Sequence, residues 1–516
     1  EVYLTPRYHL KMLSIMDRVV VTVAILLAFI LKFYCNATPS VLIVGAGSAG
    51  IAAGSKLLQN NITNVTILEA ENRIGGRIYS TKFEDAVVDL GAQWCHGEEN
   101  NTVYQLVKDL DLLRPGELIF DYYYSSGEDL DDAFVNELYN LFLSIYYEDK
   151  HDNKTSLGDY VIKRYNGSIT EKYGDDPKKL KLAGECLDLM MKKALSIEGA
   201  FSWFDISADH DYEDCEGNRL LNWKGRGFKA ILDVLMQKLP NPEKQLPIDD
   251  KIFLNEEVTG IEWDNEDSEE SEKVVVKCKD GSVYQADHVI FTPSLGVLKH
   301  NYKSLFSPAL PEEKANIIES LGIGAVFKMF LHFPHRWWPS VNSSDFVFIW
   351  AEEDKKLLLK EFPKGPVKNG TSWLINLTGL FVVNEENPKL LTAWFAGELV
   401  PEIEKCSDDL LIDGVMFVLN KFIGHDYPNM TKPDSVIRKN WYSNPHFRGT
   451  YSYQTVRSRS YAESPEIILS KPLTSSNGKQ TLLFAGEATH SIYYSTVHGA
   501  IETGFREAQR IIDLYK

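Results

Sequence analysis

Residues 41–50 read Val-Leu-Ile-Val-Gly45-Ala-Gly47-Ser-Ala-Gly50 and predict the fold of the region around them. The apolar run before Gly45 is typical of a buried strand, and residues 51–58 are typical of a helix. In such a unit the first glycine permits the tight turn, the second lets a pyrophosphate approach the backbone, and the third lets helix and strand pack. The helix N-terminus favours phosphate through its free N–H groups and its dipole. We therefore expect a dinucleotide site in an α/β fold.

A carboxylate and a second glycine-rich loop follow this unit. Glu69 ends a second expected strand, at the distance from the glycines where a ribose-binding acid is found, and it would repel the 2′-phosphate of NADP. The next residues, Arg73-Ile-Gly-Gly76-Arg77, would let the chain lie close to the cofactor, and Arg77 can neutralise its phosphates. These features indicate FAD rather than NAD.

The stretch from Glu69 to Arg77 resembles the flavin-containing amine oxidase family, which includes the monoamine oxidases and the polyamine oxidases. Residues 90–97 are similar to a second flavin-contacting loop of this family, and residues 484–490 and 496–500 are similar to its C-terminal signature. The resemblance extends from about residue 41 to residue 511. Together these motifs assign the following residues to the cofactor: Gly45, Gly47, Gly50, Glu69, Arg73, Gly76, Arg77, Gly91, Ala92, Gln93, Trp94, Val258, Trp441, Glu487, Thr496 and Val497.

The resemblance also implies a domain organisation. We expect a Rossmann-type FAD-binding domain built from three chain segments, with an α+β substrate-binding domain interleaved between them. The FAD-binding segments are expected at residues 38–110, 222–302 and 441–516. The substrate-binding segments are expected at residues 111–221 and 303–440.

In amine oxidation by a flavin, a hydride equivalent leaves the carbon beside a nitrogen, while the protein orients the substrate and excludes water. In the family that this chain resembles, a lysine holds a water near the flavin, and the stretch 324–334 has Lys328 at the matching position. Lys328 interrupts an otherwise apolar expected strand, so the alternative is an edge lysine that faces solvent. Lys299 is the rival, which we expect in a surface loop after the strand-like run 283–292.

The same resemblance assigns residues to the substrate. His96 matches a histidine of the polyamine oxidases and is expected to be catalytic and to border the substrate; a structural imidazole is the alternative. Tyr451 matches one aromatic face of the amine site, and Ser495 and Thr496 match positions beside the substrate. Glu185 is the candidate carboxylate for an ammonium group, because a charge in an apolar tunnel needs a partner. A solvated glutamate on a helix face is the alternative.

Two positions favour the polyamine branch over the monoamine branch. Thr496 stands where monoamine oxidases carry a tyrosine, and Thr450 stands where they carry the cysteine that bonds FAD, so we expect non-covalent FAD. The leading expectation is a secreted FAD-dependent polyamine oxidase acting on spermine, spermidine or N1-acetyl derivatives, with O2 as electron acceptor. The alternatives are a secreted L-amino-acid or monoamine oxidase, and a catalytically silent flavoprotein that acts as a binding protein.

The composition is that of a globular protein and limits the partners. The 516 residues are 44% hydrophobic and carry a formal net charge of −19. Such an acidic surface argues against nucleic acid and is compatible with a cationic partner such as a polyamine, with a charge for solubility as the alternative. No CxxC or HExxH motif occurs, so nothing indicates a zinc site. We expect no stable membrane partner.

Residues 16–37 are typical of a signal peptide, with an apolar run at residues 19–31; an uncleaved signal anchor is the alternative. If Cys35 leaves with this segment, five of the six cysteines remain, and a Cys186–Cys215 disulfide and two free thiols are equally favoured. An excess of N-x-S/T sequons agrees with secretion. These sequons begin at Asn61, Asn64, Asn100, Asn153, Asn166, Asn342, Asn369, Asn376 and Asn429.

Overall fold

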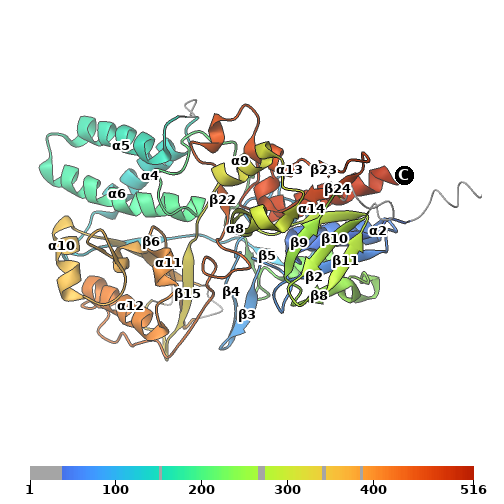
Figure 1. Ribbon diagram of the computed structural model, residues 1–516. Helices are drawn as coiled ribbons and strands as arrows, with labels where there is room; N and C mark the ends of the chain where they lie inside the picture. The colour runs from blue at the N-terminus through green and yellow to red at the C-terminus, as the bar shows by residue number, and fades with distance from the viewer. Residues whose placement is uncertain (1–37, 150–153, 265–272, 340–344, 384–387) are drawn as a thin grey trace, which may run out of the picture.

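The computed structural model describes residues 38–149, 154–264, 273–339, 345–383 and 388–516. The expected signal peptide, the sequons at Asn153 and Asn342 and the stretch 265–272 lie outside the described residues. The described chain forms two halves, each built around a six-stranded sheet (Figure 1).

The first six-stranded sheet contains the strand–loop–helix unit predicted from residues 41–58. β1 (Val41–Val44) lies in its interior, and the strands run parallel except for one edge strand, β23. All residues of β1 are buried, as expected for a parallel strand that is covered on both faces. The strand order is β23 (Leu473–Thr474), β24 (Gln480–Phe484), β12 (His288–Phe291), β1, β2 (Val65–Glu69) and β8 (Ile252–Leu254).

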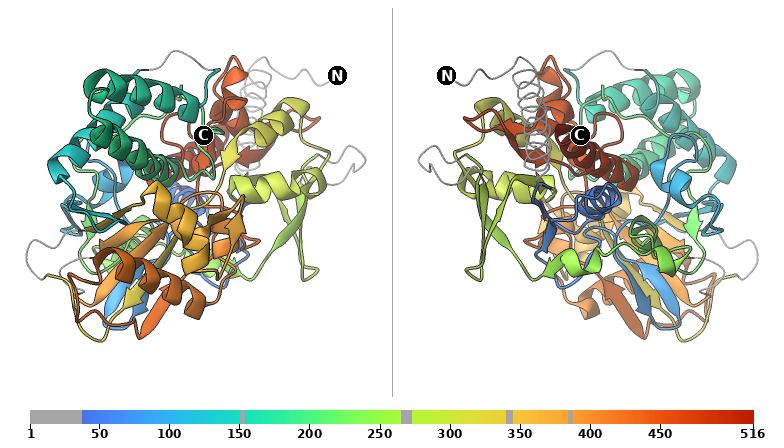
Figure 2. Two further views of the ribbon diagram at one scale, coloured as in Figure 1. Left: turned by 90° about the vertical axis from the view of Figure 1, so that its left-hand side faces the viewer. Right: turned by 90° about the vertical axis from the view of Figure 1, so that its right-hand side faces the viewer.

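Two helices from opposite ends of the chain cover one face of this sheet. α2 (Ser48–Gln59) and α14 (Val497–Leu514) lie side by side and share one apolar cluster with alternate residues of β1 and β2 (Figure 2). Their backbones approach so closely that a Cβ atom on Gly504 would lie 2.1 Å from the carbonyl oxygen of Ala49. The C-terminal segment therefore completes the domain that the N-terminal segment begins.

The other face of this sheet packs on a four-stranded sheet and on further helices. Asp287 accepts hydrogen bonds from the backbone N–H and the hydroxyl of Ser40, and it divides the run 283–292, expected as one strand, into β11 and β12. Lys299, expected in a loop, lies in a helix, and residues 303–321, expected in the substrate-binding domain, pack here. These elements are β11 (Val283–Ala286), β10 (Val274–Cys278), β9 (Val258–Glu262), β13 (Phe306–Ser307), α8 (Leu295–Leu305), α9 (Glu312–Ser320) and α13 (Pro465–Ser470).

The second six-stranded sheet forms the core of the other half. Its strand order is β21 (Ser435–Arg438), β15 (Phe327–His332), β20 (Leu390–Phe395), β19 (Leu377–Val382), β16 (Asp345–Ile349) and β6 (Phe120–Tyr124). Because side chains alternate along a strand, Val347 and Ile349 face one helical layer while Phe346 and Phe348 face another. The first layer is α4 (Asp132–Tyr146), α5 (Leu157–Tyr173) and α6 (Pro177–Glu198); the second includes α10 (Glu352–Glu361), α11 (Val400–Ile403) and α12 (Asp408–Ile423) (Figure 1).

Short elements connect these layers. The strands are β3 (Ser80–Phe83), β4 (Ala86–Asp89), β5 (Leu113–Arg114), β7 (Asn222–Trp223), β14 (Gly322–Ile323), β17 (Val367–Lys368), β18 (Thr371–Ser372) and β22 (Ser452–Tyr453). The helices are α3 (Thr102–Val107), α7 (Ala230–Leu235), and the single turns η1 (Pro242–Lys244), η2 (Asp249–Lys251), η3 (Trp373–Asn376), η4 (Ser458–Ser460) and η5 (Glu487–Thr489). Within the described part of the chain, no helix has both the length and the apolar character needed to cross a bilayer.

The Cys186–Cys215 disulfide does not form. Cys186 is buried among apolar side chains of α4, α5 and α6, whereas the sulfur of Cys215 lies 3.7 Å from Nε2 of His498 on α14. The two thiols therefore belong to different packing environments. Their proximity in the sequence suggested a pairing that the fold does not bring about.

Candidate active site

A cavity of about 1130 Å³ lies between the two halves and is lined by residues of both. It is larger than the roughly 300–1,000 Å³ of an ordinary ligand pocket, so it has room for a dinucleotide and a substrate together. Most of the residues assigned to the cofactor line it. They are Gly45, Gly47, Glu69, Gly76, Arg77, Gly91, Ala92, Gln93, Trp94, Val258, Trp441, Glu487, Thr496 and Val497.

The three glycines of the first loop have three different environments. Gly45 has a φ of +99°, and a Cβ atom there would lie 2.5 Å from Oγ1 of Thr292. A Cβ atom on Gly50 would lie 1.9 Å from the carbonyl oxygen of Gly45, so this glycine is needed for packing of helix on loop and does not line the cavity. At Gly47 the nearest atom, Cα of Gly76, would be 3.9 Å away. The protein's own packing leaves the space above Gly47 open, which fits the close approach of a pyrophosphate.

Glu69 lines the cavity, and two backbone N–H groups hold its carboxylate in place. Its two carboxylate oxygens accept hydrogen bonds of 2.8 Å from the N–H groups of Ala46 and Glu71. Burial raises its pKa, while these two donors oppose that shift. Each oxygen keeps a lone pair for a further donor, as a ribose-binding acid requires.

Arg73, assigned to the cofactor, does not line the cavity. Its guanidinium donates to the carbonyl oxygens of Ile74, Gly76 and Ile78 at 3.2, 2.7 and 3.2 Å. Arg73 therefore holds the second glycine-rich loop in shape from behind. The sequence could not distinguish these two roles, because an arginine in such a loop can bind either a phosphate or the loop's own carbonyl groups.

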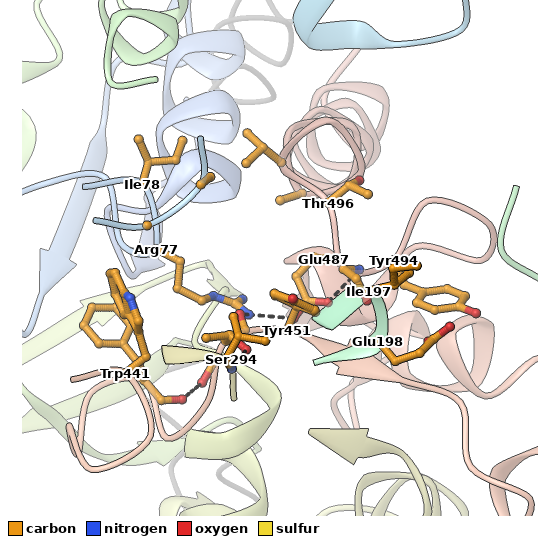
Figure 3. A pocket seen from close by; sticks show the side chains of 18 of the residues that line it. Arg77, Ile78, Ile197, Glu198, Ser294, Trp441, Tyr451, Glu487, Tyr494 and Thr496 are labelled. Atoms are coloured by element: carbon orange, nitrogen blue, oxygen red, sulfur yellow. Dashed lines mark hydrogen bonds and ion pairs between the residues drawn. The ribbon is translucent and has the colours of Figure 1, made fainter. Parts of the chain in front are cut away.

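Arg77 and Glu487 form an ion pair that joins distant segments of the chain (Figure 3). One nitrogen of Arg77 donates to Oε1 of Glu487 at 2.8 Å and to the carbonyl oxygen of Thr450 at 2.7 Å. The other oxygen of Glu487 accepts from the hydroxyl of Ser452 at 2.6 Å and from the N–H of Ser495 at 2.9 Å. Arg77 thus reaches the cavity with its charge already balanced by Glu487.

Lys328 lies in the cavity wall, not at a solvent-facing edge. It projects from β15 and is only 5% exposed. Its ammonium group donates to the carbonyl oxygen of Gly91 at 2.8 Å and to Oε1 of Gln93 at 2.9 Å, and it lies 5.4 Å from the ring centre of Trp394. Lys299, in contrast, donates to the carbonyl oxygen of Glu319 and does not line the cavity.

Burial lowers the pKa of Lys328 to about 7, against the opposing influence of the Asp89 carboxylate. An amine with such a pKa can exist with or without its proton near neutral pH, as a group that holds or moves a proton must. The ammonium has three N–H donors, of which Gly91 and Gln93 accept two. One donor is left for a water or a substrate in the cavity.

His96 has a defined tautomer. Its Nδ1 lies 2.6 Å from the carbonyl oxygen of Arg219, and since a carbonyl only accepts, Nδ1 carries the proton. His96 is accessible from the cavity, but the surrounding walls desolvate the ring and lower its pKa, which favours the neutral form. Nε2 is therefore an acceptor, and His96 is among the residues that line the cavity.

Tyr451, Ser495 and Thr496 also line the cavity. The hydroxyl of Tyr451 donates to the carbonyl oxygen of Ser196 at 2.5 Å, which fixes the ring. The hydroxyl of Ser495 donates to the carbonyl oxygen of Ser452. Thr496 caps α14, because its hydroxyl accepts from the N–H of Gly499 at 3.0 Å. The hydroxyl of Thr496 also donates to the carbonyl oxygen of Tyr493 at 2.7 Å. The hydroxyl protons of all three residues are thus committed to the protein, and Ser495 and Thr496 keep only acceptor capacity.

Glu185 does not reach the cavity, contrary to its assignment. It is 3% exposed and accepts from the hydroxyl of Tyr124 at 2.6 Å and the N–H of Glu352 at 3.0 Å. The acid of the same helix that lines the cavity is Glu198, the last residue of α6 (Figure 3). Its carboxylate accepts from the hydroxyl of Tyr146. Glu198 was missed because the sequence does not show which end of α6 lies at the cavity. That depends on how the helix packs on the rest of the protein. The glycine after it, Gly199, is the one local signal that the helix ends there.

Comparison with known proteins agrees with this geometry. A family model described as flavin containing amine oxidoreductase matches residues 48–512. "Probable polyamine oxidase 5" of Arabidopsis thaliana is 29% identical over 92% of this chain and 98% of its own length. "Peroxisomal N(1)-acetyl-spermine/spermidine oxidase" of Homo sapiens is 30% identical over 92% of this chain and 95% of its own length.

The fold is also found among solved structures. A double mutant of putrescine oxidase superposes with a TM-score of 0.59 over 92% of this chain and 99% of that chain, at 19% identity. At 19% identity the structural match shows the shared fold and nothing more. The family model, in contrast, matches almost all of the described residues. The chain therefore belongs to the flavin-containing amine oxidoreductase family, and its cofactor is FAD.

Proposed function

We propose that the chain is a secreted polyamine oxidase. It oxidises spermine, spermidine or an N1-acetyl derivative at a carbon next to a secondary amine. O2 and water are consumed, and H2O2, an aminoaldehyde and a shorter polyamine are released. The observation that carries this proposal is the cavity, in which Lys328, the fixed ring of Tyr451 and the carboxylate of Glu198 lie together with the dinucleotide cradle.

Each of these residues has a task in such a reaction. When bound, the flavin takes up the hydride equivalent from the substrate and passes the electrons to O2. Lys328 holds a water or a proton in the cavity wall with its remaining N–H. Glu198 offers a negative charge to an ammonium group that would otherwise be costly to bury. The net charge of −19 attracts polycations to the protein.

The cavity does not favour an L-amino-acid oxidase. The arginines among its lining residues are Arg77 and Arg219. Arg77 pairs with Glu487, and Arg219 pairs with Asp214 at 2.7 Å. Each arginine already has a carboxylate partner, so neither offers an uncompensated positive charge to a substrate carboxylate. At the position where monoamine oxidases carry a tyrosine, this chain has Thr496, which supplies no aromatic ring to the cavity wall.

The proposal that the chain is secreted is supported by the positions of its sequons. Among the sequon asparagines in the described residues, Asn376 is half-buried and the others are exposed on the surface, where a glycan can be attached. The exposed ones are Asn61, Asn64, Asn100, Asn166, Asn369 and Asn429. We expect the protein in the medium of expressing cells, with a mass that falls on glycosidase treatment. A cytosolic protein with no such shift would contradict secretion.

The activity is tested with the purified protein. We expect a flavin absorption spectrum that is bleached by spermine or N1-acetylspermine without O2, and one H2O2 formed for each amine oxidised in air. Benzylamine and L-leucine serve as controls for the monoamine and amino-acid alternatives. A flavin that no amine bleaches would favour the silent binding protein, and faster turnover of either control would contradict the polyamine assignment.

A further inference from the structure

Glu404 is a buried carboxylate outside the cavity. It follows α11, in the half of the molecule built around the second six-stranded sheet. Its side-chain oxygens accept four hydrogen bonds, from the N–H groups of Trp441, Tyr442 and Ser443 at 2.8, 2.9 and 2.8 Å and from the hydroxyl of Ser443 at 2.8 Å. Within the described part of the chain no lysine, arginine or histidine forms an ion pair with it. Three consecutive N–H groups therefore take the place of a counter-ion for this buried charge.

The three N–H groups belong to a loop that lines the cavity. Residues 439–451 connect β21 with β22, and Trp441 is one of several loop residues in the cavity wall (Figure 3). The backbone of Glu404 holds the beginning of the same loop, because its carbonyl oxygen accepts from Arg438 and Asn440 at 2.9 Å each. Glu404 thus fixes, from outside the cavity, the part of the loop that carries Trp441.

Trp441 connects this loop with the backbone beside Lys328. Its indole N–H donates to the carbonyl oxygen of Leu90 at 3.1 Å. Its ring lies against the next residue, since a Cβ atom on Gly91 would be 3.2 Å from Cζ2 of Trp441. The carbonyl oxygen of Gly91 accepts a hydrogen bond of 2.8 Å from the ammonium group of Lys328. Two successive carbonyl groups therefore bind Trp441 and Lys328.

The direction of the Gly91 carbonyl depends on such contacts. Glycine has more backbone freedom than other residues, so its surroundings must fix its conformation. The residues before and after Gly91 donate their N–H groups to other backbone carbonyl groups, at 2.8 and 3.1 Å. The carbonyl oxygen before Gly91 is held by Trp441. A shift of Trp441 would therefore turn the acceptor of Lys328.

We propose that Glu404 is a positioning residue for Lys328. Through Trp441 and the backbone at Leu90 and Gly91, it holds the carbonyl oxygen to which Lys328 donates, and so keeps the remaining N–H of Lys328 aimed into the cavity. This proposal rests on the role of Lys328 in the proposed function. It adds a residue that itself contacts neither cofactor nor substrate.

Glu404→Gln tests this proposal without a change of size. An amide has one carbonyl oxygen and its NH2 group cannot accept, so part of the loop backbone loses its acceptor. We expect turnover of spermine per bound flavin to fall by about 10–100-fold, since a misplacement of about 1 Å can cost roughly 10²-fold. Glu185→Gln is the matched control, because Glu185 is a buried glutamate that does not line the cavity. It should leave turnover per bound flavin unchanged.

A double-mutant cycle with Lys328→Met shows whether the effect passes through Lys328. We expect Glu404→Gln to slow turnover in the parent and to cost nothing further in Lys328→Met. Trp441→Phe keeps the ring and the hydrogen bonds to Glu404 but removes the indole N–H, and it should depend on Lys328 in the same way. If Glu404→Gln slows both backgrounds by the same factor, the proposal is wrong.

A titration without substrate separates this proposal from the proposed function. Burial lowers the pKa of Lys328 to about 7, so flavin absorbance should show an inflection near pH 7 that Lys328→Met lacks. Glu404→Gln should move this inflection to lower pH, because an ammonium group that loses an acceptor gives up its proton more easily. If the parent oxidises no amine but the inflection moves, polyamine oxidation fails while the positioning role stands. If the parent oxidises spermine and Glu404→Gln keeps the parent's inflection, the positioning role is wrong while polyamine oxidation stands.

Discussion

Two buried lysines, one in each half of the molecule, look alike by most measures. Burial lowers the pKa of both Lys314 and Lys328 to about 7. Both ammonium groups donate to carbonyl oxygens, and both lie near aromatic rings: Lys314 is 4.3 Å from the ring centre of Phe484, and Lys328 is 5.4 Å from that of Trp394. A perturbed pKa alone would name both as candidates for catalysis.

The number of acceptors around each lysine separates them. Lys314 donates to the carbonyl oxygens of Ile468, Leu469 and Lys471 at 3.1, 2.7 and 2.8 Å, so all three N–H groups are used at the end of α13. Helix ends leave carbonyl groups without partners, and Lys314 satisfies them. Lys328 has two acceptors and one donor to spare, in a cavity wall. The comparison teaches that the unused donor, more than the shifted pKa, marks the functional group.

Lys328→Met is the largest expected effect and tests one side of this comparison. The substitution keeps the length and the apolar fit but deletes the donor, so turnover with a polyamine should fall by about 10²–10⁴-fold, the range for a positioned acid or base. FAD content should change little, since the cradle around Gly47 is untouched. The free energy of unfolding should fall less than in Lys314→Met, because two acceptors, at Gly91 and Gln93, lose their partner and both lie beside the cavity. Stopped-flow reduction and reoxidation of the flavin show which half-reaction slows. Parent rates in both would show that the spare donor is not used.

Lys314→Met tests the other side. Three buried carbonyl groups lose their partner, and we expect a loss of about 2–4 kcal/mol in the free energy of unfolding, since each unsatisfied buried group costs about 1–3 kcal/mol and some relaxation follows. Turnover per bound flavin should stay at the parent value. Denaturant unfolding and peroxide assays on the same preparation measure both quantities. A drop in turnover without a drop in stability would reverse the assignments of the two lysines.

The two lysine variants can be compared only if both still bind FAD. Glu69→Ala shows what weakened FAD binding looks like in the same assays. Glu69→Ala removes two backbone-held carboxylate oxygens, and FAD binding should weaken by about 1.5–3 kcal/mol for each charge-assisted hydrogen bond lost to the ribose. Equilibrium dialysis of the flavin measures this. Thr450 stands where monoamine oxidases carry the cysteine that bonds FAD covalently, so denaturation should release all FAD from every variant. Flavin that stays on the denatured chain would contradict non-covalent binding.

The residues whose place in the cavity could be predicted from the sequence depend on local backbone geometry. A glycine pattern after a strand can serve few purposes, so the cradle around Gly45 and Gly47 and the strand that carries Lys328 were predictable. The errors concern the directions of long side chains. Arg73 turns back on its own loop, Glu185 points into the packing between helices, and the thiol expected to pair with Cys186 lies elsewhere.

The one missed acid, Glu198, was missed for a related physical reason. It is on α6, a 22-residue helix with charged residues on several sides. Which side faces the cavity is decided by packing of α6 on α5 and on the second sheet, which involves residues far away in the sequence. The domain boundary near residue 302 was misplaced for the same reason, because β13 pairs with β9 through contacts that no local pattern reveals.

The pH dependence is the most selective of these effects. Both lysines go from a pKa of 10.5 in the unfolded chain to about 7 in the folded one. Between these values the unfolded chain binds more protons, so each lysine makes the free energy of unfolding rise with pH across this window. The stability advantage of the parent over Lys314→Met should therefore grow from pH 7 toward pH 10, measured by denaturant unfolding at each pH. A constant difference would mean that the ammonium stays charged throughout.

Only Lys328 should add a titration to the activity. Turnover should rise with pH in every variant, because the reacting amine must lose its proton before it can give up hydride. On this rise the parent should show a further inflection near pH 7 from Lys328, whose pKa is lowered to about 7 by burial. Lys314→Met should keep this inflection and Lys328→Met should lose it. If Lys314→Met moves the inflection, the two lysines are coupled. The number of acceptors around each ammonium group would then not be enough to assign one lysine to stability and the other to activity.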